Sequence, residues 1–318
     1  MWISPYKYVL SLGHLCSDIN QSILSAVLPF LIATYHYDYT TAAMLVTVSN
    51  VFGAFVQPFI GMLSDKKNKL LYMTLGVLLD SGGMAVTGFI SNFFGLWIVV
   101  IMSGIGVAMF HPQAAKLFNS VSSKNAKGKG MSIFSFGGKV GFTLGPVYTA
   151  FLMNLFGMKG TILFLIPGIV FGIVCSFFNK DFENLDVLEV EKKEKVKSEQ
   201  KDDWSGFIKL CCVVFSRSIL SNGISTFLAF YFIQQFSKSN SFASMLLSVF
   251  YGIGSITLLG GGIADCFGHR KMVRLSFCIF LPAIFIFTNT SHFVIALIML
   301  IFMTCGESLS YSPMVVLG

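Results

Sequence analysis

Charged residues are scarce in this sequence. Lys, Arg, Asp and Glu make up 12% of its 318 residues, whereas an ordinary soluble domain carries about 25%. Hydrophobic residues account for 54%, and the mean hydropathy is +0.75. A soluble fold of this size could not bury so much apolar surface, because many of its residues must face water. The composition excludes an ordinary soluble enzyme, a nucleic-acid-binding domain and a disordered chain, and it favours a polytopic membrane protein.

CxxC pairs and hydrolase motifs are also missing, and we expect no cleavable signal. None of the seven cysteines belongs to a CxxC pair, so we interpret them as small hydrophobic residues in helices and expect neither a metal ion nor a cofactor. The first apolar stretch is about 25 residues long, which predicts a retained helix rather than a signal peptide. No GxSxG, HExxH or paired-aspartate motif occurs in the apolar stretches, which argues against an intramembrane enzyme.

Ten apolar stretches are long enough, at about 20 residues, to cross the hydrocarbon as helices. They are residues 8–33, 42–63, 70–90, 94–116, 130–155, 161–178, 205–236, 242–264, 272–288 and 293–318. With a cytoplasmic N-terminus, 18 of the 22 Lys and Arg residues fall in inside segments and two in outside loops. This bias predicts that orientation in the cell membrane, and it explains the net charge of +7 without a nucleic-acid partner.

A charged segment divides the apolar stretches into six and four. Residues 180–203 contain nine acidic and six basic residues and almost no apolar cluster, so they cannot bury enough surface to order themselves. We therefore predict an N-terminal six-helix bundle over 1–179, a cytoplasmic linker over 180–204 and a partial C-terminal bundle of four helices over 205–318.

A short motif recurs 200 positions apart, after the second and the eighth apolar stretch. Its residues are Gly61, Asp65, Lys66 and Lys69 in the first copy, and Gly261, Asp265, Gly268 and Arg270 in the second. The glycine would let two helices approach closely, and the aspartate could pair with a basic group and latch a cytoplasmic gate. The recurrence indicates an internal duplication; the alternative is two ordinary turns whose charges fix the topology.

This G-x-x-x-D-basic motif resembles the signature of the major facilitator superfamily. The segments GHLCSD at 13–18, FHPQA at 110–114 and GGKVGFTLGP at 137–146 resemble its fosmidomycin-resistance branch. The resemblance implies an all-α membrane bundle of twelve helices in two halves, with substrate bound between them, of which about ten helices are present here. Because the chain ends within the tenth stretch, we expect a truncated chain. The branch tends to have Glu at Gln113 and Asn at Lys139, positions that bear on proton coupling and substrate.

Ionisable groups inside a membrane cost about 2.5–3.5 kcal/mol each, so they usually face a cavity or a partner. His14 and Asp18 are spaced i,i+4, and Gln21 continues their stripe, which predicts a cavity-lining face with Asp18 as the proton site. The alternative is a structural hydrogen-bonded pair. His111 precedes Pro112 and could take part in proton coupling, or it could satisfy the helix ladder that the proline breaks.

Four further membrane groups are candidates for the same pathway. They are Asp80 and Glu307, both acidic and mid-span, and the cations Lys139 and Arg217. Two cations suggest an anionic substrate; the alternatives are a salt bridge from Lys139 to Asp18 or Asp80, and an Arg217 side chain that extends to the interface. The fifth stretch also carries Gly137, Gly141, Gly145 and Pro146, a flat face for helix packing. By resemblance, this run favours exchange transport.

The function we expect from the resemblance is secondary active transport. A small organic anion or drug would be exported in exchange for protons by alternating access, with Asp18 and either Glu307 or His111 changing protonation and Lys139 with Arg217 binding the anion. The expected partners are that substrate, protons and the lipid bilayer, for a protein that works as a monomer. Two alternatives remain: an uptake symporter for an anionic nutrient, and a non-transporting relic or sensor.

Overall fold

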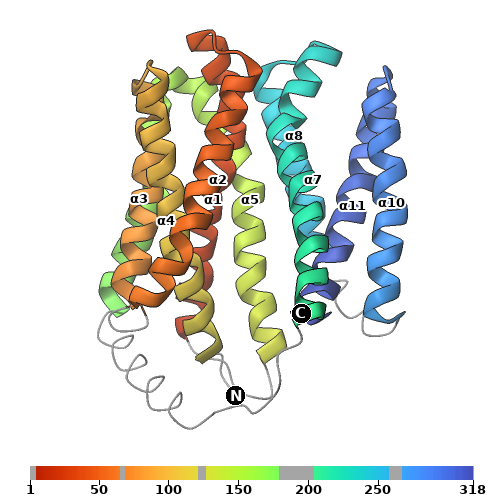
Figure 1. The fold of residues 1–318 in the computed structure, drawn as a ribbon. Helices are drawn as coiled ribbons and strands as arrows, with labels where there is room; N and C mark the ends of the chain where they lie inside the picture. Colours follow the sequence, from red (N-terminus) through yellow and green to blue (C-terminus); the bar gives the residue numbers. More distant parts are fainter. Residues whose placement is uncertain (1–4, 65–68, 121–126, 179–203, 258–266, 318) are drawn as a thin grey trace. The chain divides into compact units, whose positions relative to one another are not determined.

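The structure is a computed structural model that describes residues 5–64, 69–120, 127–178, 204–257 and 267–317. Within these ranges every regular element is a helix (Figure 1). The helices belong to two compact units, Met1–Lys197 and Ser198–Gly318. Of the expected linker over 180–204, only Trp204 is among the described residues, so its conformation stays a prediction.

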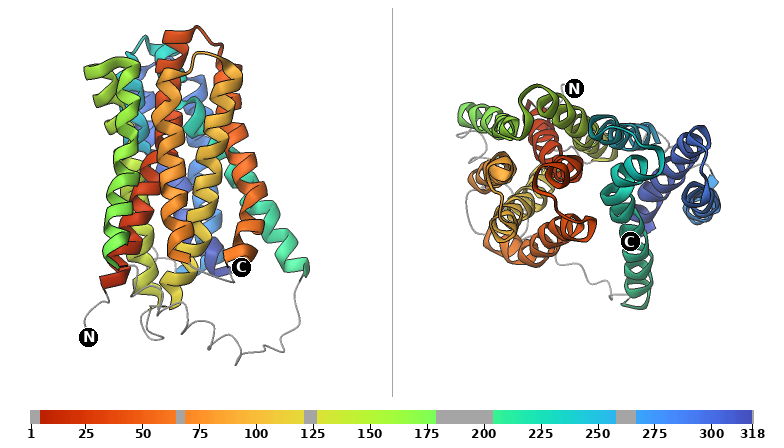
Figure 2. Two further views of the ribbon diagram at one scale, coloured as in Figure 1. Left: turned by 90° about the vertical axis from the view of Figure 1, so that its left-hand side faces the viewer. Right: turned by 90° about the horizontal axis from the view of Figure 1, so that it is seen from above.

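The first unit is built around its first helix. Its elements are α1 (Pro5–Tyr35), α2 (Tyr39–Ser64), α3 (Lys69–Val86), the short turn η1 (Thr87–Phe89), α4 (Phe93–Ser120), α5 (Lys127–Phe156), η3 (Gly157–Leu165) and a helix over residues 166–178. α1 packs most extensively against α5 and also contacts α2, α3, α4 and η3. Seen end-on, the helices of this unit lie side by side (Figure 2). Side chains on α1 can therefore meet several other helices.

Apolar side chains fill the centre of this unit. Phe110 and Phe118 on α4 and Phe171 in the helix over residues 166–178 are fully buried. Cys16 and Cys175 lie in the same cluster, as expected for cysteines that behave as small hydrophobic residues. This core surrounds one end of α1 and holds the polar part of that helix in place.

The contact between α1 and α5 runs along glycines. A Cβ atom added at Gly137, Gly141 or Gly145 would meet the carbonyl oxygen of Ser11, Leu15 or Ile19 on α1. Pro146 follows within α5 and is buried. Glycine at every fourth position brings the two backbones together because no side chain separates them.

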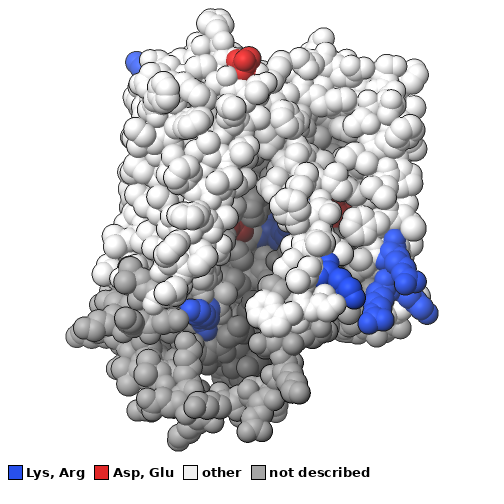
Figure 3. Space-filling model, viewed as in Figure 1, with Lys and Arg blue, Asp and Glu red and all other residues white. Residues whose placement is uncertain are grey.

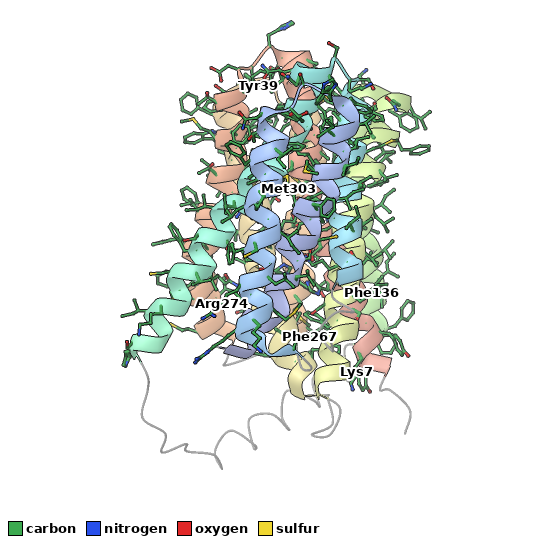
Figure 4. All side chains as sticks on the ribbon, turned by 90° about the vertical axis from the view of Figure 1, so that its right-hand side faces the viewer. Lys7, Tyr39, Phe136, Phe267, Arg274 and Met303 are labelled. Carbon is green, nitrogen blue, oxygen red and sulfur yellow. The ribbon has the colours of Figure 1, made fainter. Side chains whose placement is uncertain are left out.

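The second unit contains four described helices, α7 (Trp204–Phe236), α8 (Asn240–Thr257), α10 (His269–Asn289) and α11 (Phe293–Leu317). α10 packs mainly against α11, which also contacts α8 and α7. Basic side chains gather where α10 begins (Figure 3), and they belong to Arg270, Lys271 and Arg274. Figure 4 places Arg274 at this end of the unit and Met303 further along it. The basic end is the one that the charge bias assigns to the cytoplasm.

Seven helices among the described residues are long and apolar enough to cross a membrane, against ten expected stretches. The expected stretches 130–155 and 161–178 lie in one helical run, Phe134–Phe178. The stretches 242–264 and 293–318 are only partly described, so they do not add full-length spans. The all-helical membrane class is as expected, whereas the number of spans differs for these two reasons.

The two units share the same internal arrangement of helices, turns and glycine contacts. α3 and α10 begin 200 positions apart, as do α4 and α11. The turn after α1 places His36 at φ 58°, and the turn after α7 places Ser237 at φ 51°. A Cβ on Gly106 would strike the backbone of Asp80, and a Cβ on Gly306 would strike that of Phe280, again 200 positions apart. This agreement supports the internal duplication that the sequence motif indicates.

Candidate functional site

Three ionisable side chains meet inside the first unit. His14 and Asp18 lie one turn apart on α1, and His111 reaches them from α4. Nε2 of His14 is 3.3 Å from Oδ2 of Asp18, and Nε2 of His111 is 3.3 Å from Oδ1 of Asp18. The Asp18 side chain is only 5% exposed. We call these three residues the His–Asp–His cluster.

A glycine on α5 leaves the space that this cluster occupies. A Cβ atom on Gly138 would lie 2.6 Å from Nε2 of His14 and would also strike the Asp18 carboxylate. The sequence directs attention to its neighbours Gly137 and Gly141, which touch the α1 backbone instead. Gly138 therefore belongs to the site, although no spacing rule distinguishes it from other glycines.

Two contacts orient the His14 ring. Nδ1 lies 2.8 Å from the carbonyl oxygen of Phe134, and the Phe134 ring stacks on the imidazole with centroids 4.1 Å apart. A carbonyl oxygen can only accept, so Nδ1 carries the hydrogen in this bond. Nε2 of a neutral His14 then directs its lone pair at the Asp18 carboxylate, an unfavourable contact unless a cation lies between them.

Lys139 is a further charge near the cluster. It is partly exposed on α5, near enough for its positive charge to act on Asp18, and a salt bridge between the two residues stays a prediction. Gln21 is partly buried one turn beyond Asp18 on α1. Gln113 is fully buried and donates from Nε2 to the carbonyl oxygen of Ile60 on α2 at 3.4 Å, so it links α4 to α2.

Asp80 lies in a separate polar layer between α3 and α4. Ser103 Oγ donates to Asp80 Oδ1 at 2.6 Å, and Asp80 is fully buried. Next to it, Asn20 Nδ2 donates to Ser81 Oγ at 2.6 Å and joins α1 to α3. Sequence reasoning missed Asn20, Ser81 and Ser103, because uncharged polar residues are common in membrane helices and carry no spacing signal.

Arg217 and Glu307 form an ion pair inside the second unit. Nη2 of Arg217 on α7 contacts Oε1 of Glu307 on α11, and the side chains are 14% and 10% exposed. Ser221 Oγ donates to the same oxygen at 3.2 Å, and Ser308 Oγ donates to Oε2 at 3.3 Å. Arg217 is thus paired within the unit rather than extended to the interface, which was one alternative from the sequence.

The repeated glycine–aspartate motif is described only in part. Asp65, Lys66, Gly261 and Asp265 lie outside the described residues, so the gate stays a prediction. Gly61 lies in α2, where an added Cβ would meet no atom within 4 Å. Lys69 begins α3, Arg270 is exposed, and Gly268 precedes α10 at φ 89°, a backbone conformation that favours glycine.

Comparison with known proteins identifies the family. A sequence model of the Major Facilitator Superfamily matches residues 10–318. The chain belongs to the Major Facilitator Superfamily. The fosmidomycin resistance protein of Escherichia coli K12 is 23% identical over 276 residues, which cover 83% of this chain and 66% of that protein. The uncharacterized MFS-type transporter YfnC of Bacillus subtilis 168 is 24% identical over 278 residues, or 85% and 68% of the two chains. The chain spans about two thirds of the length of both relatives.

Solved facilitator structures share the fold. A bacterial homologue of the human lysosomal transporter Spinster, inward-facing and occupied, aligns with a TM-score of 0.80 at 15% identity over 98% of this chain and 73% of that one. The xylose transporter XylE of E. coli, partially occluded and inward open, aligns with a TM-score of 0.76 at 15% identity over 100% and 87%. The expected all-α membrane bundle of the facilitator type and the resemblance to the fosmidomycin branch are confirmed. The chain is a multi-pass membrane protein.

Proposed function

We propose that this facilitator carries out secondary active transport, in which a small organic anion or drug leaves the cell in exchange for protons by alternating access. The name of the E. coli relative, a fosmidomycin resistance protein, supports export. So does the multi-drug resistance efflux pump PmrA of Streptococcus pneumoniae TIGR4, which is 28% identical over 148 residues. The protein would act as a monomer in the plasma membrane with its N-terminus in the cytoplasm.

The observation that carries the proton-coupling part is the orientation of His14. Because its Nδ1 is engaged by the Phe134 carbonyl, only Nε2 faces Asp18. A proton between Nε2 and the carboxylate removes the repulsion between two electron pairs, so the contact forms a place for one exchangeable proton. His111 contacts the other oxygen of the same carboxylate. This arrangement couples two helices, α1 and α4, to the occupancy of one proton site.

In this proposal, Lys139 and Arg217 bind the anion. Lys139 near Asp18 and Arg217 beside Glu307 are positive groups on membrane helices. An anionic substrate, such as a phosphonate or a carboxylate, would offset the cost of holding either charge in the membrane. Arg217 must loosen its contact with Glu307 before it can bind an anion with its full set of donors.

Transport in proteoliposomes with an imposed pH gradient tests the proposal. We expect Asp18→Asn to abolish proton-driven movement of a phosphonate such as fosmidomycin and to leave the amount of folded protein unchanged. Asp38→Asn is the matched control: Asp38 is exposed and accepts the Thr41 N–H at the start of α2, and asparagine caps a helix equally well. Unchanged gradient-driven transport in Asp18→Asn would remove the cluster from proton coupling.

The Arg217–Glu307 pair favours a second candidate, uptake by symport. A proton on Glu307 would release Arg217 for the anion, so proton and anion would bind together, as symport requires. In exchange transport the two ligands would compete instead. Anion affinity measured as a function of pH separates the candidates, because it rises on acidification for symport and falls for exchange.

A further inference from the structure

The His–Asp–His cluster combines the side chains that transition metals prefer. Two imidazoles and one carboxylate are common ligands of zinc and related divalent ions. We propose that His14, Asp18 and His111 bind a divalent transition-metal ion of the zinc type, which replaces the coupling proton at the same position; only this last clause rests on the proposed function.

The distances fit such an ion. One ligand atom from each residue can be chosen so that all three lie within 4.8 Å of one another. Ligand atoms bound tetrahedrally at the usual zinc distances of about 2.0–2.1 Å are about 3.3 Å apart. His14 Nε2 lies 3.3 Å from Oδ2 of Asp18, and His111 Nε2 lies 3.3 Å from Oδ1, so the two rings approach different oxygens of one carboxylate. A rotation of the Asp18 carboxylate that presents one oxygen to both rings would bring the three ligand atoms around one ion.

His14 and Asp18 are also prepared for a metal, whereas the buried Nδ1 of His111 has no hydrogen-bond partner among the described residues. Histidines that bind metals usually donate their other ring N–H to a carbonyl or carboxylate, which fixes the tautomer. His14 does so through its Nδ1 and the Phe134 carbonyl oxygen. Asp18 Oδ1 is buried and accepts no hydrogen bond among the described residues. Asp18 Oδ1 therefore has no hydrogen bond to give up before it coordinates.

Access and charge limit how tightly the ion is held. The His14 and His111 side chains are 16% and 29% exposed, so the cluster is not sealed. Three protein ligands leave a fourth position for water or an anionic substrate atom. The positive charge of Lys139 acts on Asp18 and opposes a second cation nearby. We expect Lys139→Gln to strengthen metal binding for this reason.

Zinc binding to the purified full chain in detergent, measured by competition with a chromophoric chelator, is the primary test. We expect one Zn²⁺ per chain and no displacement by Mg²⁺, which prefers oxygen ligands. His111→Gln and Asp18→Asn should each weaken binding by at least about 10–100-fold, the range seen when even an outer partner of a metal ligand is lost. His292→Gln, an exposed histidine on the second unit, should bind as the original chain does.

Two further measurements do not depend on a loss of binding. His111→Cys should retain an ion but shift preference toward Cd²⁺, because thiolate is the softer ligand. X-ray absorption at the zinc edge of the original chain should show imidazole and oxygen ligands. Absence of zinc binding in the original chain, or equal binding after His14, Asp18 and His111 are all replaced, would overturn the proposal.

The metal site and the proposed transport function can fail separately. Zinc binding at the cluster together with unchanged proton-driven transport in Asp18→Asn would keep the metal site and reject the coupling role. Loss of transport in Asp18→Asn without zinc binding to the original chain would keep the coupling role and reject the metal site. If both hold, Zn²⁺ should inhibit proton-driven transport, and His292→Gln should be inhibited at the same zinc concentration as the original chain.

Discussion

The first helix of each unit offers a direct comparison. The most apolar 18-residue windows of α1 and α7 both have a mean hydropathy of 1.4. Inside the structure, 72% of the α1 window is buried, whereas none of the described side chains in the α7 window is. α1 packs along the glycines of α5, while α7 contacts α8 and α11 and its Tyr231 hydroxyl donates to the Phe287 carbonyl oxygen of α10. Hydropathy thus places a helix in the membrane, but its helix partners determine what it buries.

The two units also differ in the side chains that they carry at equivalent backbone positions. Gly106 and Gly306 make matching contacts, yet the residue that each faces is Asp80 in the first unit and Phe280 in the second. The serine that bonds to Asp80, Ser103, has Met303 as its counterpart 200 positions later. The matching backbone contacts agree with an internal duplication, while the residues at the equivalent positions give each unit its own polar groups.

The largest effect is expected at the Arg217–Glu307 ion pair of the second unit. Glu307→Ala leaves Arg217 buried without its carboxylate, which should reduce stability by about 3–5 kcal/mol. The double variant Arg217→Met with Glu307→Leu should recover most of that loss, because no charge is left behind. Thermal unfolding in detergent checks both variants. Equal stability of the single and double variants would show that the pair does not compensate a buried charge.

The glycine face should give the next largest effect. In Gly141→Ala, the new methyl group strikes the Leu15 carbonyl and lies 3.0 Å from Asp18 Cβ, so we expect a loss of about 1–3 kcal/mol. Gly223 on α7 is the matched control, since a Cβ there meets no atom within 4 Å. Gly223→Ala should be neutral or raise stability, because alanine favours the helix. Similar melting temperatures for the two variants would contradict the burial difference between α1 and α7.

A smaller effect is expected at the hydrogen bond between Ser103 and Asp80. The equivalent positions of the second unit are the apolar Met303 and Phe280. Ser103→Ala removes the hydroxyl that donates to Asp80 and should cost about 1–2 kcal/mol, since a buried acceptor loses its donor. Met303→Leu, at the corresponding position of α11, should cost less because it nearly conserves volume. The order of the two melting temperatures checks this, and the reverse order would contradict it.

The smallest effect concerns the caps of α2 and α8. The hydrogen bond from Thr41 lowers the pKa of Asp38, which is exposed outside the spans. Its folded pKa is below its unfolded value, so its contribution is present above the usual aspartate range and is lost as the pH falls through the folded value. Ser239 caps α8 with a hydroxyl that does not titrate. Asp38→Ser should therefore remove a slight acid sensitivity of melting, and an unchanged acid profile would contradict this.

Local patterns in the sequence were sufficient to predict the family, the all-helical membrane class and the position of His14 and Asp18 on one face of a helix. Four-residue spacing translates directly into neighbours on one helix. The contact of His111 with Asp18 and the pairing of Arg217 with Glu307 were not predictable in this way. Each joins two helices, so it depends on how those helices rotate against each other. Gly138 was missed for the same reason, because its role is defined by side chains on another helix.

The connection between α1 and α2 has a consequence for insertions. Only residues 36–38 separate the two helices, and α2 then meets α4 where a Cβ on Gly53 would touch the Gly104 carbonyl. One extra residue that entered α2 instead of lengthening the loop would rotate the following helix by about 100° around its axis and bring a bulkier side chain into the place of Gly53. The length of this short hairpin therefore helps to select which surface of α2 its neighbour recognises.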